Sequence, residues 1–557
     1  MARAARRPAV ASLWCGHKRR SVFHIVGATL LGDLALAAAS ADGHTAAGLG
    51  SRSSGGGQRL RGGASARAGV AEELGTEAGL RLVDAFLEGR PRQEAGEAPR
   101  GHAPSLLQTY GPEIQGGGGP CGAFCELQPS GRFDIYDSAV SAIYWTYRGR
   151  LREAERIVAA FERLLYARDD LAGNYSYGPE HGLVLPPGHR LTLLASAYTN
   201  VSGEPGVYSG PGIADGSVDT GNNAWAALAM VHFSVFAGRP CYEVAARNVL
   251  RALAASASCQ DELGGLMGRL SPHARFYRST EHNVDVFALS RMLGERAVEE
   301  RARRFVQAMY GYGADHNASY ATGTQGDGPC NATSLPAMAA DAQFWSVLAG
   351  ADPDREQQAA ALLQALRPVS EGGLLSYDDD VIGPAGNNLE GIRFTSTGSG
   401  AQWENTAAAS LALERFSGRW GGQGAGLSAA AAAAAEEAAP RLRRSVLRLL
   451  GAYGAVPGSV RGGNYLAYTA WKEQNASGLE RLREAWEAWK DNASSADVLP
   501  PGGSATGIGW TYLRVAHTAA TAWTGLALLG VNPYEAPVTI GRTAAPASHS
   551  CRPGSGQ

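Results

Sequence analysis

Residues 219–254 read DTGNNAWAALAMVHFSVFAGRPCYEVAARNVLRALA and contain two successive helical segments of different character. In residues 222–236, apolar and small side chains occupy nearly every position, which is typical of a helix that is buried on all sides. In residues 242–254, apolar residues recur at i, i+3 and i+4 and leave a charged face, as expected for a helix exposed on one side. The stretch therefore predicts a buried helix followed by an exposed one.

The same pair of segments recurs along residues 130–530. Further buried helices are predicted at 138–147, 283–293, 339–348, 405–416 and 516–529. Further exposed helices are predicted at 151–166, 296–309, 354–366 and 441–450. The polar residues that precede or open the buried helices lie 82, 62, 60, 63 and 113 positions apart: Asp137, Asp219, Glu281, Asp341, Glu404 and His517. Recurrence near 60 residues indicates a repeated helical hairpin.

Six buried helices with exposed partners predict an all-α fold, an (α/α)6 toroid of six helical hairpins, and an open α-solenoid is the alternative. No exposed helix follows residue 529, and the segment 72–89 is predicted to fill that place. The interval of 113 is attributed to a further helix at 479–490 and to an alanine-rich, low-complexity insertion at 418–440. The predicted organisation is a signal peptide or anchor at 1–41, a low-complexity linker at 42–120, the toroid at 121–535 and a flexible tail at 536–557.

The composition excludes several classes of protein. The chain has 557 residues, 45% of them hydrophobic, and a net charge of −2 from 50 basic and 52 acidic residues. This even balance gives no electrostatic basis for binding nucleic acid. The apolar fraction excludes wholesale disorder, and only one segment is apolar enough to be considered for a membrane. The 73 glycines follow no three-residue period, so the chain is not collagen-like.

The first 41 residues have the parts of a secretory signal: basic residues without acids, an apolar run at 22–39 and small residues near Ala41. A retained type II membrane anchor and an organellar, for instance plastid, transit peptide are the alternatives. Glycosylation sequons lie at Asn174, Asn200, Asn317, Asn331, Asn475 and Asn492, more than chance predicts. Removing the leader leaves six cysteines, an even number that suits disulfides, although buried thiols remain an alternative. We expect a secreted or luminal protein.

Acids, aromatic residues and amides cluster where the buried helices begin. In a toroid these helix ends meet at one rim, and such a funnel suits a sugar, since two carboxylates are the usual machinery of glycoside hydrolysis. The predicted acid/base residues are Glu281, Asp219, Asp341 and Glu404, with Glu281 ranked first. The predicted substrate-binding residues are Tyr136, Asp137, Asn222, Asn223, Trp225, His282, Asn283, Asp285, Gln343, Trp345, Trp403, Trp510 and His517.

Structural roles compete with these assignments. Asp137 and Asp219 stand where aspartate commonly caps a helix, and His517 has the alternative of a hydrogen-bonded core histidine. The tryptophans are equally suited to the core. The run of aspartates at 378–380 is interpreted as a solvated loop rather than a calcium site, and no metal or cofactor is predicted. Phosphate-loop, G-x-S-x-G and H-E-x-x-H motifs are absent from the sequence.

Four stretches resemble a group of bacterial secreted or envelope proteins of the six-hairpin glycosidase-like class. They are STEHNVDVFA at 279–288, DTGNNAWA at 219–226, DAQFW at 341–345 and AATAWTGLALLGVNP at 519–533. The resemblance covers most of residues 130–535 and implies an (α/α)6 fold and carbohydrate processing. It is less specific for a reaction, because the same toroid hosts hydrolases, lyases and epimerases.

Three functions follow as hypotheses. The first is a glycoside hydrolase that acts on a polysaccharide or oligosaccharide through a pair of carboxyl groups. The second is a polysaccharide lyase or sugar epimerase, in which Tyr136, His282 and His517 would move the protons. The third is a carbohydrate-binding protein without activity. A terpene-cyclase-like toroid is a distant alternative, because no Asp-rich metal motif falls on a predicted helix.

Overall fold

The computed structural model describes residues 74–94, 103–113, 131–171, 173, 175–199, 203–380, 384–420, 426–461, 503–508 and 510–535. Several sequence predictions lie outside these residues: the leader, the helix at 479–490, the tail, and the sequons at Asn174, Asn200, Asn475 and Asn492. Of the cysteines, Cys121, Cys125 and Cys551 also lie outside them.

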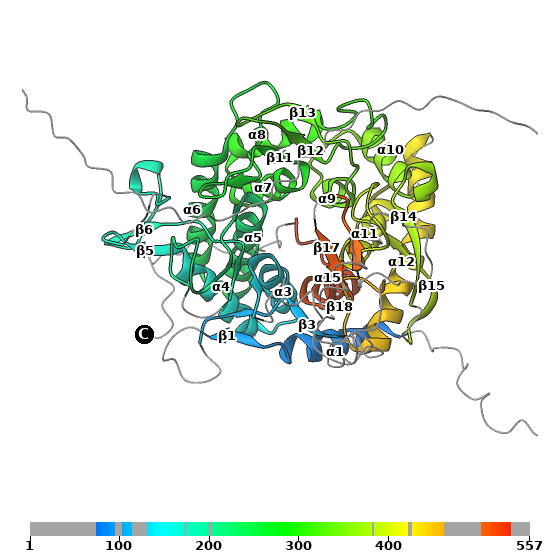
Figure 1. Cartoon of the computed structure of the whole chain (residues 1–557), viewed down its shortest axis with the longest axis horizontal. Coiled ribbons are helices and arrows are strands. Elements are labelled where there is room, and N and C mark those ends of the chain that lie inside the picture. The colour runs from blue at the N-terminus through cyan, green and yellow to red at the C-terminus, as the bar shows by residue number, and fades with distance from the viewer. Residues whose placement is uncertain are drawn as a thin grey trace, which may run out of the picture. The chain divides into compact units, whose positions relative to one another are not determined.

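In the described part of the chain, six inner helices form a closed ring, which Figure 1 shows from one end. They are α3 (Ile135–Tyr147), α5 (Thr220–Ala237), α7 (Thr280–Leu293), α9 (Ala340–Ala349), α11 (Trp403–Trp420) and α15 (Thr518–Leu529). Each packs against the next in chain order, and α15 packs back against α3. The ring buries most of their side chains, including the apolar ones on all faces, which is why these helices carry so few charges.

An outer helix covers each inner one, again in the described residues. The outer helices are α1 (Thr76–Glu88), α4 (Leu151–Leu165), α6 (Pro240–Ala257), α8 (Arg296–Ala308), α10 (Arg355–Ala365) and α12 (Leu427–Tyr453). Helices α4, α6, α8, α10 and α12 pack on the inner helix that precedes each of them in the chain. The predicted (α/α)6 toroid is therefore confirmed, and the open solenoid is excluded because the inner ring closes.

Helix α1 completes the outer layer from the far end of the chain. It packs on α15 and also contacts α12. Its residues Leu80, Val83 and Leu87 are buried, and Asp84 receives hydrogen bonds from the Tyr144 hydroxyl at 2.6 Å and the Arg148 guanidinium. The segment 72–89 thus supplies the missing outer helix, as its position in the sequence repeat predicted.

The alanine-rich stretch differs from its prediction as an insertion. Residues 418–420 end α11, and Leu427–Tyr453 is one continuous outer helix with Pro440 inside it. Ala431, Ala435 and Ala439 face inward and are buried against the neighbouring helices. Small side chains allow α12 to approach α11 closely, so the low complexity reflects packing rather than disorder.

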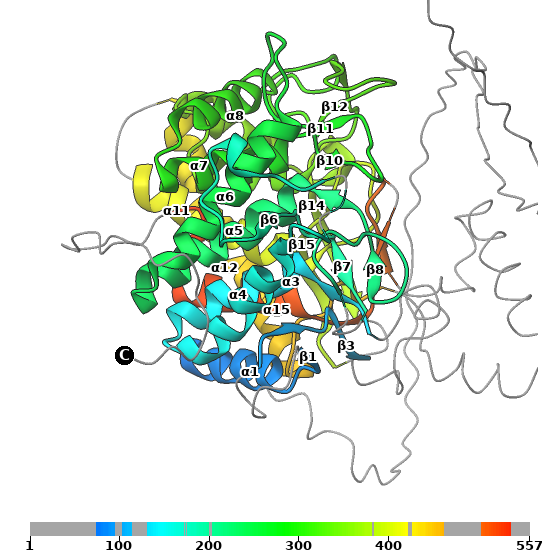
Figure 2. The same ribbon diagram turned by 90° about the vertical axis from the view of Figure 1, so that its left-hand side faces the viewer.

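Short strands gather at one end of the helices (Figure 2). Those before α5 are β1 (Arg92–Glu94), β2 (Ser105–Leu107), β3 (Tyr110–Glu113), β4 (Phe133–Asp134), β5 (Tyr166–Arg168), β6 (His189–Leu191), β7 (Ala197–Tyr198), β8 (Ile213–Asp215) and β9 (Val218–Asp219). Those after it are β10 (Arg269–Leu270), β11 (Tyr277–Ser279), β12 (Gly323–Gln325), β13 (Thr333–Ser334), β14 (Leu375–Asp380), β15 (Gly386–Ile392), β16 (Gly503–Ala505), β17 (Thr511–Leu513) and β18 (Val515–His517). All the strand ladders are antiparallel, with two or three strands each.

The strands lead directly into inner helices and so fix where those helices begin. β4, β9, β11 and β18 end one residue before α3, α5, α7 and α15 respectively. Sequence reasoning did not find these strands, because two- or three-residue pairings leave no alternating pattern to detect.

Residues 105–113 also differ from their prediction as linker. β2 pairs with β1, and β3 pairs with β18, the strand that introduces α15. Leu106 and Leu107 are fully buried, so this segment belongs to the toroid and carries Tyr110 to the rim.

The aspartate run at 378–380 is not a solvated loop. It lies in β14, where Asp378 and Asp380 are buried and Asp379 is exposed. The Arg514 guanidinium binds Asp380 at 2.8 Å, and Arg461 lies 3.1 Å from Asp378. Among the described residues, no cluster of His, Cys, Asp and Glu side chains has the arrangement of a metal site.

A disulfide joins Cys259 and Cys330, and Cys241 is disulfide-bonded as well, so the prediction of disulfides is confirmed for these residues. In the ranges that the structure describes, no helix combines the length and the apolar character needed to cross a membrane.

Candidate active site

The inner helices present their second residues toward a common cavity at the rim. These residues are Tyr136 on α3, Gly221 on α5, Glu281 on α7, Asp341 on α9, Glu404 on α11 and Ala519 on α15. All of them except Ala519 line the cavity. Three neighbouring helices, α7, α9 and α11, therefore each place a carboxyl group at the same height.

The carboxyl groups of Glu281 and Asp341 form a pair in the cavity wall, and the hydrogen bond between them raises the pKa of Glu281 and lowers that of Asp341. Burial raises the pKa of Glu281 well above its ordinary value, and the negative charges of Asp341 and Asp285 raise it further. Burial also raises the pKa of Asp341, to about 6, although the bond from Glu281 opposes this. Glu281 is therefore the member of the pair that keeps its proton to higher pH, and it donates that proton in a hydrogen bond to Asp341.

Glu404 lines the same cavity as this pair, and a chain of hydrogen bonds from α15 and α3 leads to it. The Tyr136 hydroxyl donates to Oε1 of Glu404 at 2.5 Å, and Nε1 of Trp523 donates to the Tyr136 oxygen at 2.8 Å. Burial raises the pKa of Glu404 to about 7, while the bond from Tyr136 acts in the opposite direction. Glu404 is 4% exposed, and the bond from Tyr136 fixes its orientation. A buried, oriented carboxyl group with a raised pKa is typical of a catalytic site.

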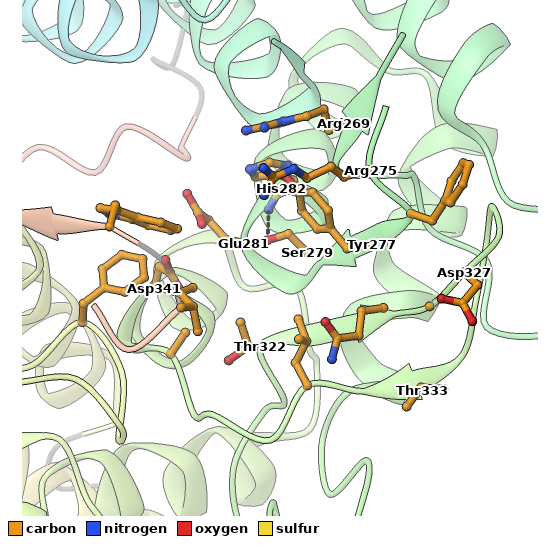
Figure 3. A pocket seen from close by; sticks show the side chains of 18 residues that line it. Arg269, Arg275, Tyr277, Ser279, Glu281, His282, Thr322, Asp327, Thr333 and Asp341 are labelled. Atoms are coloured by element: carbon orange, nitrogen blue, oxygen red, sulfur yellow. Dashed lines mark hydrogen bonds between the residues drawn. The ribbon is translucent and has the colours of Figure 1, made fainter. Parts of the chain in front are cut away.

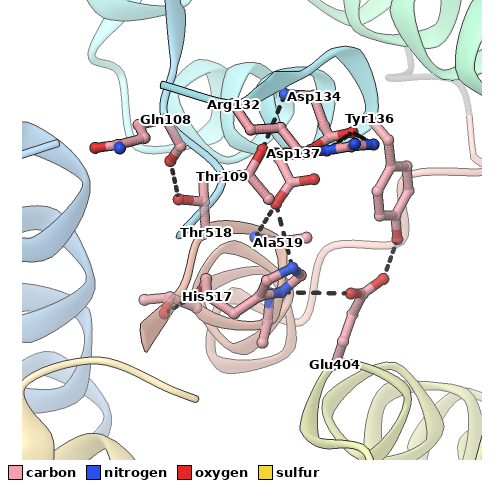
Figure 4. A network of polar contacts seen from close by, with 12 residues as sticks. Gln108, Thr109, Arg132, Asp134, Tyr136, Asp137, Glu404, His517, Thr518 and Ala519 are labelled. Carbon is pink, nitrogen blue, oxygen red and sulfur yellow. Dashed lines mark hydrogen bonds and ion pairs between the residues drawn. The ribbon is translucent and has the colours of Figure 1, made fainter. Parts of the chain in front are cut away.

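His517 lies between Glu404 and Asp137 (Figure 4). Its Nδ1 lies 3.7 Å from Oε2 of Glu404, and its Nε2 lies 3.6 Å from Oδ1 of Asp137. Burial lowers the pKa of His517 to about 4, so the imidazole is neutral at neutral pH. Nδ1 also accepts a hydrogen bond from the backbone N–H of Ala520 at the start of α15, so the proton resides on Nε2.

The two aspartates that precede α3 and α5 are tied to arginines. Nε of Arg269 lies 2.7 Å from Oδ1 of Asp219, and the Ser196 hydroxyl donates to Oδ2 at 2.6 Å. Arg132 binds both carboxylate oxygens of Asp134 at 2.8 Å. Asp219 makes no side-chain hydrogen bond that caps α5, and Asp137 instead accepts one from the Ala519 N–H of α15 at 3.0 Å.

Aromatic rings form the floor of the cavity. Trp225 and Trp345 pack edge to face with ring centroids 5.6 Å apart, and Trp345 stacks on Trp523 at the same separation. Tyr136 and Tyr534 complete this cluster. All three tryptophans are at most 2% exposed, so the floor is a packed core whose upper edge meets the cavity.

Two adjoining cavities make up the cleft. The first, of about 470 Å³, contains Tyr136, Asp137, Asp219, Asn222 and Glu404 among its lining residues. The second, of about 590 Å³, extends toward Phe276, Asp327 and Thr333 (Figure 3). Both volumes fall within the range of about 300–1,000 Å³ that is usual for small-molecule sites. Seven residues line both cavities: Arg269, Tyr277, Glu281, His282, Asp341, Phe394 and Trp510.

The structure brings most of the residues predicted from sequence into this cleft. Those in it are Glu281, Asp219, Asp341, Glu404, Tyr136, Asp137, Asn222, Trp225, His282, Trp345, Trp510 and His517. His282 is half-buried in the cleft wall, and a side chain at Gly221 would meet the His282 ring at 2.5 Å, so only glycine allows this packing.

The remaining predicted residues line neither cavity: Asn223, Asn283, Asp285, Gln343 and Trp403. Asp285 accepts the Tyr534 hydroxyl at 2.8 Å in the core, and Trp403 is fully buried. The amides of Asn223, Asn283 and Gln343 pair with the backbone of Leu194, Leu266 and Tyr320, respectively.

The same kind of backbone contact recurs around the ring, at the fourth residue of each inner helix. In each case the side chain accepts a backbone N–H from another segment at 2.8–3.1 Å: Ser138, Asn223, Asn283, Gln343, Thr406 and Thr521. Each hairpin of the repeat therefore uses the same position to anchor a loop of the rim through a side-chain hydrogen bond. A polar residue at the fourth position of an inner helix therefore indicates a structural amide, whereas Asn222, at the third position of α5, lines the cleft.

Sequence reasoning missed several cleft residues, including Tyr110, Arg132, Asp134, Arg269, Phe276 and Tyr277. Most of them lie on the short strands β3, β4, β10 and β11. Asp134 and Ser279 immediately precede inner helices, so the position before each helix was a usable signal. Tyr110 had none, because its segment has the composition of a linker.

No protein-family model matches the chain, and no curated protein matches it. Among solved structures, a family 76 glycoside hydrolase from a bovine Bacteroides thetaiotaomicron strain is 11% identical, with a TM-score of 0.38, over 82% of this chain and 77% of that chain. A glycosidase is 13% identical, with a TM-score of 0.44, over 82% and 97%. An unsaturated glucuronyl hydrolase specific for heparin is 10% identical, with a TM-score of 0.41, over 82% and 95%. At these identities and TM-scores, the matches assign no activity to this chain.

Proposed function

We propose that the protein is a glycoside hydrolase that acts on an oligosaccharide or polysaccharide. The observation that supports this most directly is the set of three carboxyl groups on consecutive inner helices, in which Glu281 keeps its proton in preference to Asp341. Two carboxyl groups in different protonation states are what hydrolysis of a glycosidic bond requires. The aromatic faces of Trp510 and Phe276 at the cleft surface supply platforms for sugar rings.

In the proposed reaction, Glu281 is the general acid and Glu404 the opposing carboxylate. Glu281 gives its proton to the glycosidic oxygen as the bond from that oxygen to the anomeric carbon breaks. Glu404 either takes a proton from the water that adds to the anomeric carbon or attacks that carbon itself before water releases the sugar. Asp341 accepts the hydrogen bond of Glu281, and Tyr136 donates to Glu404 and holds it in place.

The roles are tested with Glu281→Gln, Glu404→Gln and Asp341→Asn. Each variant is expected to lower kcat by a factor on the order of 10²–10⁴ on a natural linkage found by glycan screening. An aryl glycoside with a good leaving group needs no acid, so it should restore the first step in Glu281→Gln only. Added azide should restore turnover in Glu404→Gln only, since it replaces the missing base or nucleophile. Unchanged turnover in all three variants would exclude carboxyl catalysis at this site.

We also propose that the chain passes through the secretory pathway. The Cys259–Cys330 disulfide and the exposed sequon at Asn317 support this proposal. Expression of the full chain in a eukaryotic cell, followed by treatment with an N-glycosidase, should shift its electrophoretic mobility. Replacing Asn317 by Gln should reduce that shift, and an untreated mobility equal to that of the bare chain would contradict the proposal.

A further inference from the structure

The pair formed by Glu281 and Asp341 stands at the junction of the two cavities. Both residues line the first cavity, on the side of α3 and α5, and both line the second, on the side of β11 and β12. Glu404 lines the first cavity only, so it faces the pair from one side. The cleft therefore continues in two directions from the proposed general acid instead of ending there.

From this geometry we infer that the cleft binds an uncharged glycan chain through both cavities at once, so that cleavage falls at an internal bond. This inference rests on the proposed glycoside hydrolase function and specifies its substrate. Each hydrolysis would add one water across an internal linkage and leave two shorter chains, one with a new reducing end. A site for terminal units alone needs a cavity on one side of the acid, whereas here the larger cavity lies beyond it.

The second cavity has the surface chemistry of a sugar-binding groove. The exposed fractions of Phe276, Ile508 and Trp510 are 38%, 37% and 48%, although such side chains are usually covered. Trp510 packs edge to face on Phe394 with ring centroids 5.1 Å apart, which fixes its orientation. Gln325 and Thr333, from β12 and β13, add amide and hydroxyl groups for hydrogen bonds to the sugar. Aromatic faces beside fixed polar groups suit a chain of pyranose rings.

The charges of the cleft argue for an uncharged glycan. Arg132 and Arg269 are held by Asp134 and Asp219, so neither guanidinium is available to neutralise a uronate or sulfate group. The exposed Arg275 shares the second cavity with Asp327. Of the further carboxyl groups that line the cleft, Asp215 has a lowered pKa and Asp341 a pKa of about 6, so both add negative charge at neutral pH and an anionic chain would be repelled.

The inference is tested with uncharged oligosaccharides, from disaccharide to hexasaccharide, labelled at the reducing end and built on glucan, xylan and mannan linkages. We expect kcat/KM to rise with chain length and the first products to arise from internal bonds. Phe276→Ala should lower kcat/KM about tenfold on the hexasaccharide and leave the shortest cleaved substrate nearly unaffected, because only long chains reach this side chain. Tyr377→Ala is the matched control, since Tyr377 is 57% exposed on β14 and lines neither cavity.

Release of terminal units only, with kcat/KM independent of length, would overturn the inference and leave the hydrolase proposal intact. A preference for oligosaccharides of uronic acids would overturn the uncharged substrate class. If no glycan is cleaved, calorimetric titration with the same series separates the two proposals. Affinity that rises with length in the wild type and falls in Phe276→Ala would support the binding cleft without hydrolysis, whereas no binding would refute both.

Discussion

The hydroxyl oxygen of Tyr136 lies 2.5 Å from Oε1 of Glu404, although the two residues are 268 positions apart in the chain. Their helices, α3 and α11, are not neighbours in the inner ring, because α15 packs between them. The bond therefore joins the two helices on either side of α15, whose Trp523 donates to the same tyrosine oxygen. This contact links the start of the toroid to its later hairpins at the point where the chemistry is proposed.

Replacing Tyr136 by Phe should change the pH dependence of activity. The tyrosine bond opposes the effect of burial on Glu404, so its loss should raise the pKa of Glu404 above about 7. The acidic limb of kcat/KM should then move to higher pH, and kcat/KM at neutral pH should fall about tenfold. Trp523→Phe is the control, because it removes the donor to Tyr136 but keeps the bond to Glu404. If the acidic limb of the pH profile of kcat/KM does not move in Tyr136→Phe, Glu404 does not act in its ionised form.

Glu404→Gln should stabilise the protein at neutral and alkaline pH. The pKa of Glu404 is raised from 4.5 to about 7 in the folded state, so between these values the folded state binds more protons than the unfolded one. The free energy of unfolding therefore decreases as pH rises from about 4.5 to about 7. At pH 8, the variant should exceed the wild type by on the order of 2–3 kcal/mol, and below pH 4 the two should be equal. Glu436→Gln, at an exposed position on α12, is the matched control.

Thermal or urea unfolding across this pH range measures the effect. A difference between Glu404→Gln and the wild type that does not depend on pH would mean that the carboxyl group is not destabilised by burial.

The neighbours Asn222 and Asn223 should respond in opposite ways to replacement by Ala. Asn223 accepts the Leu194 N–H at 2.8 Å and donates to the Leu194 carbonyl, both buried, so Asn223→Ala should lower the free energy of unfolding by about 2–3 kcal/mol. Asn222 lines the cleft and is half-buried, so Asn222→Ala should leave the Tm unchanged and raise KM. Equal effects of the two variants on Tm would contradict the division between anchoring and binding amides.

Glutamate at Ala435 should be far more damaging than glutamate at Ala433. Ala435 is fully buried on α12, whereas Ala433 is exposed two positions away. A carboxylate at 435 has to be buried without a partner, which should cost at least about 3 kcal/mol in the free energy of unfolding. Ala433→Glu should change it by less than about 0.5 kcal/mol. If the two variants are equally stable, Ala435 is not packed in the core, and the stretch is a low-complexity insertion as the sequence predicts.

The pairing of buried and exposed helices can be predicted from the sequence, because the burial of a helix determines which residue types occur along that same segment. A helix that is surrounded by other helices, such as α5, is apolar at nearly every position, and its exposed partner α6 is not. The recurrence of this pair near 60 residues predicted the ring, and the position of 72–89 predicted how it closes. The candidate acids were found for the same reason, since each of them stands at the start of a buried helix.

Other features depended on contacts between distant segments. β3 exists because residues 110–113 pair with β18, and nothing in their own composition indicates a strand. The sequence predicts an insertion where the alanines of α12 lie, because a run of small side chains is equally compatible with a low-complexity segment and with close packing against a neighbouring helix.

The pattern of apolar residues along the chain is enough to predict the alternation of buried and exposed helices, the toroid and the rim at which its acids gather. The pairing of Glu281 with Asp341, the bond from Tyr136 to Glu404 and the binding of Asp219 by Arg269 follow only from the folded ring. Hydrophobic periodicity is a property of one segment, whereas the protonation of a carboxyl group depends on desolvation and on charges a few ångströms away. Those neighbours come from helices that meet only when the ring has closed.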